Sequence, residues 1–219
     1  MNRQNGLAER LAISPVVPVL TIEDADHAVP LARALLDGGI GVVEVTLRTK
    51  AAMAAMAAMI AEVPGMVVGA GTVLTAAQYR AVADLGVQFV VSPGSSPQVL
   101  QAAADSRVPF LPGAASATEV LHLLEAGFHL QKFFPAEPAG GISMLKAIGA
   151  PIAEVRFCPT GGITPTNAAL YLALANVICV GGSWLTPAAA MRNHDWGHIT
   201  TLAAEAAALR ESGVRGLDR

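Results

Sequence analysis

A lysine within an apolar segment is the residue whose surroundings most favour covalent chemistry. Lys132 lies in a short run with the character of a β-strand and is followed by Phe133 and Phe134. The chain's other lysines, Lys50 and Lys146, fall at or within predicted helices, where solvated charges are ordinary. Burial disfavours the charged ammonium, and the neutral amine is the form that attacks a carbonyl carbon. We therefore interpret Lys132 as a Schiff-base nucleophile; a structural lysine paired with a carboxylate is the alternative.

A carboxylate is predicted in the middle of a second strand. Residues 42–48 alternate so that Glu44, Thr46 and Arg48 share one face of that strand. A carboxylate at such a position is costly unless it is paired or functional. We interpret Glu44 as a catalytic acid and base, and Arg48 as a clamp for an anionic group. A structural ion pair between these two residues is the alternative.

Glycine pairs follow two consecutive apolar strands. Gly161-Gly162 ends one strand, and Gly181-Gly182-Ser183 ends the next. Glycines let backbone N–H groups approach an anion, and a helix that begins near residues 164–167 adds its positive dipole end. One pair alone would indicate only a tight turn, but two pairs together predict a phosphate site.

Thr72 follows another strand end, after Gly71. Its hydroxyl is suited to donate a hydrogen bond to a substrate carboxylate, but the spacing equally fits a simple turn residue. Cys158 and Cys179 lie inside predicted strands, where buried thiols are favoured over a disulfide. No metal site is predicted, because no histidine forms a ligand spacing with cysteine, aspartate or glutamate. The histidines are His27, His122, His129, His194 and His198.

The elements that must position these residues repeat along the chain. Candidate strands begin at intervals of 21 to 26 residues, which is enough chain for one strand, one helix and two loops. Eight such units predict a (β/α)8 TIM barrel, with its active site at the carboxyl ends of the strands. An open doubly wound sheet is the alternative, but its usual glycine-rich first turn is missing from residues 18–22. The strand starts are near Val16, Val42, Met66, Gln88, Pro109, Leu130, Val155 and Val177.

Helix boundaries are predicted from capping residues. Asp24 is expected to open a helix that stops at Gly38-Gly39, and residues 51–62 form the next helix. A short helix over residues 7–13 is expected to cover the bottom of the barrel, and the last helix spans 198–210. Further N-caps are predicted at Thr75, Ser96, Ser116 and Thr166.

Composition indicates one domain over residues 1–219. The chain is 53% hydrophobic and 14% charged, with a net charge of −3 that gives no reason to expect nucleic acid or a membrane as a partner. No segment has the apolar length of a membrane span, and residues 1–9 lack the features of a secretory signal. A cytoplasmic α/β enzyme is the expectation.

Six motifs, in order along the chain, resemble the family of 2-keto-3-deoxy-6-phosphogluconate (KDPG) aldolases, whose members also cleave 4-hydroxy-2-oxoglutarate (KHG) to varying degrees. The resemblance extends from about Val16 to the last helix and implies a (β/α)8 barrel that assembles as a homotrimer. The motifs are PVVPV (15–19), VEVTLRT (43–49), GAGTVL (69–74), KFFPAE (132–137), RFCPTGGI (156–163) and GGSW (181–184).

The resemblance also implies a role for each matching position. Lys132 becomes the Schiff-base lysine, Glu44 the acid and base, and Thr72 a neighbour of the pyruvate carboxylate. Arg48 matches the arginine of the same motif as Glu44. Pro93, Phe134 and Thr160 are then expected to line the pyruvate pocket, and Gly161, Gly162, Gly182 and Ser183 to bind phosphate.

The implied reaction is a class I aldol cleavage of KDPG to pyruvate and glyceraldehyde 3-phosphate. It needs no cofactor beyond the covalent imine on Lys132, and cleavage of KHG to pyruvate and glyoxylate is a plausible second activity. The residues do not distinguish between the two C4 epimers of the substrate, the gluconate and the galactonate forms. The rivals are a metal-dependent aldolase, a phosphosugar isomerase or epimerase, and a non-catalytic phosphosugar-binding barrel. An isomerase would leave Lys132 without a role.

Overall fold

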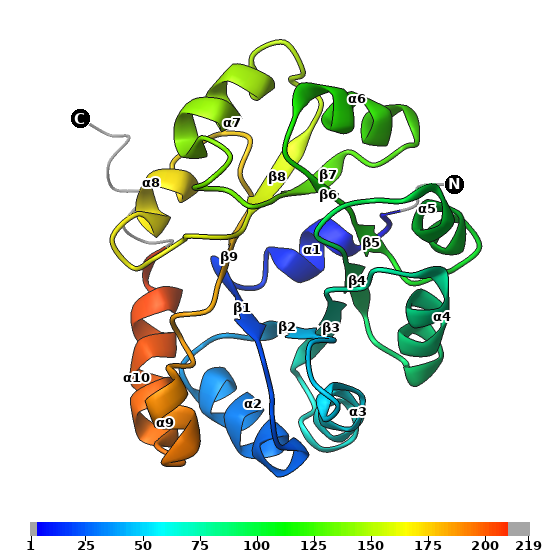
Figure 1. Ribbon diagram of the computed structural model, residues 1–219. Helices are drawn as coiled ribbons and strands as arrows, with labels where there is room; N and C mark the ends of the chain where they lie inside the picture. The colour runs from blue at the N-terminus through cyan, green and yellow to red at the C-terminus, as the bar shows by residue number, and fades with distance from the viewer. Residues whose placement is uncertain (1–3, 210–219) are drawn as a thin grey trace.

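Short parallel strands curve around a common centre, and longer helices lie outside them (Figure 1). This arrangement comes from a computed structural model that describes residues 4–209. The strands are β1 (Val16–Leu20), β2 (Val42–Thr46), β3 (Val67–Gly71), β4 (Phe89–Val91), β5 (Phe110–Leu111), β6 (Gly113–Ala114), β7 (Leu130–Phe133), β8 (Arg156–Pro159) and β9 (Val180–Gly182).

The strands form two curled sheets. One has the order β5-β4-β3-β2-β1-β9 and the other the order β6-β7-β8. The predicted fifth strand appears as two, because Pro112 has no amide hydrogen for the ladder and separates β5 from β6. The carbonyl of Pro112 still accepts a hydrogen bond from Lys132 N at 2.8 Å. The α/β class and the parallel pairing are confirmed, in two sheets rather than one continuous sheet.

Helices alternate with the strands as the sequence predicts. They are α1 (Leu7–Leu11), the 3-10 turn η1 (Ala25–His27), α2 (Ala28–Asp37), α3 (Ala52–Glu62), α4 (Ala76–Leu85), α5 (Pro97–Ala104), α6 (Ala117–Glu125), α7 (Gly141–Gly149), α8 (Ala168–Leu172), α9 (Ala188–Arg192) and α10 (Trp196–Ala207). Thr75, Ser96 and Ser116 cap their helices as predicted.

The two glycines predicted to end α2, Gly38 and Gly39, have different roles. Gly39 takes the left-handed backbone conformation, with φ 86°. Gly38 does not; it permits α10 to approach, since a Cβ there would lie 2.4 Å from Ala203 Cβ. The predicted start of this segment at Asp24 is confirmed, because the Asp24 carboxylate accepts a hydrogen bond from Asp26 N at 3.0 Å.

Two predicted helix starts are displaced. The N-cap of α8 is Asn167 rather than Thr166, whose hydroxyl is instead bonded to that of Thr164 at 2.9 Å. The last helix begins two residues earlier than predicted, because the carboxylate of Asp195 accepts a hydrogen bond from His198 N. Its predicted end at Arg210 lies outside the described residues, as do residues 1–3 and 211–219 of the predicted domain.

Alternation along the strands separates two apolar clusters. On β2, Val43 and Val45 pack outward against the helices, whereas Val42 faces inward. On β7, Phe133 packs outward and Leu130 inward, so Lys132 shares the inner face with Leu130. The inner cluster is closed by α1, which confirms the predicted covering helix. Its members are Leu7, Leu11, Val17, Val42, Phe89, Val91, Leu111, Leu130, Cys158, Ile178 and Cys179.

The two cysteines of this inner cluster are buried thiols, as predicted. Across residues 4–209, no helix has the length and apolar character needed to cross a membrane.

Candidate active site

Lys132 and Glu44 meet on the inner side of the strands. Lys132 Nζ lies 3.0 Å from one carboxylate oxygen of Glu44 and 3.2 Å from the other. Only 4% of Lys132 and 3% of Glu44 is exposed, so solvent does not screen the pair. Eighty-eight positions separate the two residues in the chain. The structure thus joins the two residues that the sequence analysis singled out for covalent and proton-transfer chemistry.

Small residues on the neighbouring strands make room for this pair. A Cβ at Gly71 would lie 2.2 Å from a carboxylate oxygen of Glu44, so only glycine fits there. Gly113 is the register partner of Lys132, and a Cβ on it would lie 2.2 Å from the carbonyl oxygen of Pro93. The predicted pocket residue Pro93 therefore packs against the strand beside the lysine.

Thr72 has a strained backbone. Its φ of 56° is in the left-handed region, which a β-branched residue rarely adopts and which costs about 1–3 kcal/mol. The residue directly follows Gly71, against which the carboxylate of Glu44 lies. Strain of this kind persists where the side chain has a use, and it supports the carboxylate-binding interpretation of Thr72 over that of a simple turn residue.

Replacement of Thr72 by glycine should separate these interpretations. Glycine relieves the strain, at the expense of about 1 kcal/mol from greater freedom in the unfolded chain. We expect an unchanged or higher free energy of unfolding in urea, together with weaker binding of pyruvate in imine formation. Full pyruvate affinity in this variant would show that Thr72 only forms the turn.

A cavity of about 250 Å³ opens at the carboxyl ends of the strands. It adjoins the ion pair, because Phe134 lines it and Lys132 Nζ lies 5.4 Å from the centre of the Phe134 ring. Seven predicted site residues line the cavity, whereas Lys132, Glu44, Thr72 and Pro93 lie outside its lining. The seven are Arg48, Phe134, Thr160, Gly161, Gly162, Gly182 and Ser183.

Three lining residues were not predicted, Val19, Thr21 and Ile163, whereas Gly181 belongs to the second predicted glycine pair. Thr21 directly follows β1, and its position at a strand end was a signal that the sequence analysis passed over. Its hydroxyl lies 3.4 Å from that of Thr46, which bonds Leu20 O at 2.8 Å. Because the proton of Thr46 is used in that bond, Thr21 must be the donor in the contact between the two hydroxyls.

The glycine loop after β8 is held by its carbonyl groups. Three successive carbonyl oxygens accept hydrogen bonds from groups outside the loop. The bonds are Ala136 N to Thr160 O (2.8 Å), Glu137 N to Gly161 O (3.0 Å) and Asn167 Nδ2 to Gly162 O (3.1 Å).

The amides of this loop consequently face the other way. In a trans peptide, the N–H of one residue points opposite to the C=O of the residue before it. The N–H groups of Gly162 and Ile163 therefore point away from the groups that hold the carbonyls, and no backbone acceptor within residues 4–209 binds them. These two amides, beside Ser183, are suited to the oxygens of a phosphate.

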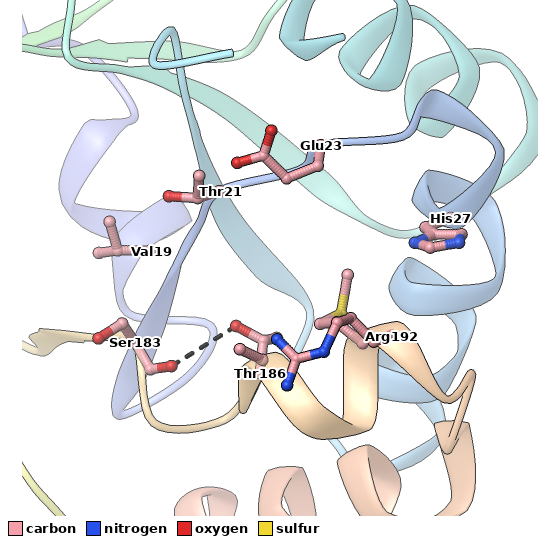
Figure 2. Close-up of a pocket in the computed structure, with 9 residues that line it drawn as sticks. Val19, Thr21, Glu23, His27, Ser183, Thr186 and Arg192 are labelled. Atoms are coloured by element: carbon pink, nitrogen blue, oxygen red, sulfur yellow. Dashed lines mark hydrogen bonds between the residues drawn. The ribbon is translucent and has the colours of Figure 1, made fainter.

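A second pocket of about 410 Å³ extends the mouth of the cavity and shares Val19, Thr21 and Ser183 with it. Arg192 and Thr186 both line this second pocket (Figure 2), and the Thr186 hydroxyl bonds Ser183 O at 3.5 Å. The rest of its lining is Glu23, His27, Ala188 and Met191.

The histidines do not gather into a ligand cluster in the described part of the chain. His27 lies edge-on to His194, with ring centroids 4.5 Å apart, and His194 stacks on Trp196 at 5.7 Å. These contacts are aromatic packing.

Comparison with known proteins agrees with this geometry. The model of the KDPG and KHG aldolase family matches residues 7–202. The KHG/KDPG aldolase of Escherichia coli K12 is 48% identical over 196 residues, covering 90% of this chain and 92% of that protein. The 2-dehydro-3-deoxy-phosphogluconate aldolase of Pseudoalteromonas atlantica is 50% identical over 194 residues, covering 89% and 90%.

Solved structures are similar along nearly the whole chain. KDPG aldolase from Legionella pneumophila, with pyruvate captured as a covalent carbinolamine intermediate, has a TM-score of 0.89 at 46% identity and covers 91% of this chain and 97% of its own. The Zymomonas mobilis enzyme with 3-phosphoglycerate has a TM-score of 0.88 at 46% identity, with coverage of 95% and 97%. The chain belongs to the KDPG and KHG aldolase family.

Proposed function

We propose that this protein is a class I aldolase that cleaves KDPG to pyruvate and glyceraldehyde 3-phosphate, and that it also cleaves KHG to pyruvate and glyoxylate. The observation that carries the proposal is the buried contact of Lys132 Nζ with the Glu44 carboxylate, beside a cavity that ends in unoccupied amides. The covalent pyruvate intermediate of the Legionella relative supports the same chemistry.

Imine formation begins with a proton transfer within the pair. Glu44 accepts a proton from the Lys132 ammonium over the 3.0 Å contact, which leaves a neutral amine. The amine nitrogen adds to C2 of the 2-keto acid to give a carbinolamine. Glu44 then gives its proton to the departing hydroxyl, so that loss of water leaves a protonated imine and restores the Glu44 carboxylate. No metal or organic cofactor takes part in these steps.

Carbon–carbon cleavage uses the imine as an electron sink. Glu44 removes the proton of the C4 hydroxyl, the C3–C4 electron pair moves toward the imine nitrogen, and glyceraldehyde 3-phosphate leaves. Glu44 then returns a proton to C3 of the enamine, and hydrolysis of the imine releases pyruvate and restores Lys132. One carboxylate beside the lysine can serve all of these proton transfers.

The two ends of the substrate fix C4 near Glu44. We propose that Arg48 and Thr72 bind the carboxylate and that Pro93, Phe134 and Thr160 line the pyruvate pocket. The amides of the glycine loops and the hydroxyl of Ser183 take the phosphate. Holding both ends contributes to the rate through positioning.

The proposal is tested by borohydride reduction in the presence of pyruvate and by cleavage assays on KDPG, its C4 epimer and KHG. A covalent pyruvate adduct on Lys132 and chelator-insensitive cleavage are expected. Absence of the adduct, or loss of activity with EDTA, would contradict a Schiff-base mechanism. The ratio of rates on the two epimers gives the stereochemical preference at C4.

We also propose that the two sheets complete a (β/α)8 barrel and that three chains assemble into a trimer. Bridges from Phe157 to Val177 and from Thr160 to Gly181, which link β8 to the last strand, support the closure. The trimer rests on the family resemblance. Light scattering is expected to give three times the 22.4 kDa mass of one chain, and a monomer mass would contradict the trimer.

A further inference from the structure

Helix α8 is connected to the glycine loop after β8, here called the phosphate loop, by two polar side chains, one directly and one through Glu137. Asn167, at the N-cap of the helix, and Tyr171 are four residues apart, so they lie on one face, one turn after the other. Neither residue was singled out by the sequence analysis. Neither lines the cavity, so a role for them must act through the loop.

Asn167 bonds the loop directly. Its side-chain nitrogen donates to Gly162 O at 3.1 Å, while its side-chain oxygen accepts from Thr164 N at 2.8 Å. One amide group thus ties the glycine loop to the start of the helix. It also fixes the direction of the peptide group whose N–H belongs to Ile163.

Tyr171 acts on the loop through Glu137. The tyrosine ring is fully buried, and its hydroxyl donates to a carboxylate oxygen of Glu137. Glu137 N bonds Gly161 O, and a Cβ at Gly162 would lie 2.6 Å from Glu137 Cβ. Glu137 therefore holds the loop through a hydrogen bond and by direct packing, and Tyr171 holds Glu137.

The charge state of Tyr171 suits this contact. Burial, and then the hydrogen bond and charge of the Glu137 carboxylate, raise the pKa of Tyr171 well above its usual range. The phenol accordingly keeps the proton that it donates at neutral pH, and the Glu137 carboxylate is turned toward the helix.

We propose that Asn167 and Tyr171 are positioning residues that brace the phosphate loop, and that this brace sets the preference for phosphorylated over unphosphorylated substrates. The inference rests on the proposed aldolase function and names the structural source of its phosphate specificity. If the carbonyls of residues 161 and 162 turn, the amides that follow them turn away from the phosphate. A hydrogen bond to a charged group, once lost, lowers affinity roughly ten- to hundredfold.

The experiment compares two substrates that differ only in the phosphate, KDPG and 2-keto-3-deoxygluconate. For Tyr171→Phe and Asn167→Ala, kcat/KM on KDPG is expected to fall by about tenfold or more, mainly through KM, with little change on 2-keto-3-deoxygluconate. Borohydride trapping of pyruvate should be unchanged. The matched control is Tyr79→Phe: Tyr79 is also fully buried and donates to one acceptor, Val108 O, but belongs to α4.

If kcat/KM fell by the same factor on KDPG and on 2-keto-3-deoxygluconate, or did not fall on either, the proposed brace would be overturned. An equal fall would show a general structural role for the two residues. Calorimetric titration with inorganic phosphate gives a readout that does not depend on cleavage. Weaker phosphate binding in both variants than in Tyr79→Phe supports the brace even if no 2-keto acid is cleaved, and equal binding overturns it. Failure of the aldolase proposal itself would appear in the wild-type protein, as absence of a pyruvate adduct.

Discussion

Replacing Lys132 with alanine is expected to lower kcat/KM for KDPG by a factor on the order of 10⁴ to 10⁶, the range seen when a covalent nucleophile is removed. The physical reason is that, within residues 4–209, no other amine lies at this position: Lys50 is in the turn before α3, and Lys146 is in α7. Cleavage assays measure the loss. Mass spectrometry after borohydride and pyruvate treatment should show the adduct in wild type and none in the variant.

Loss of activity in Lys132→Ala could come from a destabilised fold as well as from the missing nucleophile, and a control must separate the two causes. Alanine leaves Glu44 buried without its partner, and breaking a buried ion pair costs about 3–5 kcal/mol of stability. Lys132→Arg is the matched control, because arginine retains a cation for Glu44 but does not deprotonate to become a nucleophile. A folded, inactive and adduct-free arginine variant supports the mechanism. An adduct that persists in either variant would assign the imine to another residue.

The positions of the catalytic pair could be predicted from alternation along two strands. Leu130 and Lys132 share one face of β7, and Val42 and Glu44 share one face of β2, as the pattern of apolar residues indicates. The 3.0 Å contact between Lys132 and Glu44 could not be predicted in this way. It depends on how the sheets curl and bring together residues that are 88 positions apart in the chain. A pairing of Lys132 with a carboxylate was expected to be compatible with catalysis, because a nearby carboxylate can carry protons, and the structure shows Glu44 in that position.

The phosphate loop was predicted from its glycines, but its mechanism of orientation was not. Gly161 and Gly162 signal a close backbone approach, yet the direction of their amides depends on partners in distant segments. Ala136, Glu137 and Asn167 supply those partners, and nothing in their local spacing marks them. Local patterns identify residues that touch a ligand more readily than residues that hold those residues in place.

The limits of local patterns are also visible in the fold. Pro112 divides a predicted strand through its missing amide hydrogen, a rule that applies to any proline but was not applied at this position. The left-handed backbone of Thr72, unlike the strand break at Pro112, could not be predicted by a local rule, because a threonine gives no local signal for positive φ. Such a conformation is imposed by surrounding packing and becomes visible only in three dimensions.

Replacement of Glu44 by glutamine is expected to separate the proton transfers from imine formation. Glutamine keeps the size and hydrogen-bonding shape of the side chain but cannot accept a proton. Loss of a general acid and base lowers turnover by about 10²- to 10⁴-fold, so kcat for KDPG should fall by this factor. Imine formation with added pyruvate can exchange its protons with water, whereas cleavage needs a base placed at the C4 hydroxyl, so pyruvate trapping should fall far less than turnover.

Exchange of the pyruvate methyl protons in deuterated water isolates the proton transfer at C3 that we assign to Glu44. This half-reaction requires the imine and a group that moves protons at C3, but no carbon–carbon cleavage. If Glu44 is that group, Glu44→Gln should retain the borohydride adduct and lose exchange, while Glu62→Gln, an exposed glutamate at the end of α3, should retain both. A structural ion pair predicts another outcome, in which misplacement of Lys132 reduces adduct, exchange and cleavage by the same factor. The ratio of exchange to trapping therefore decides whether the carboxylate that contacts Lys132 positions the lysine or carries the protons of its reaction.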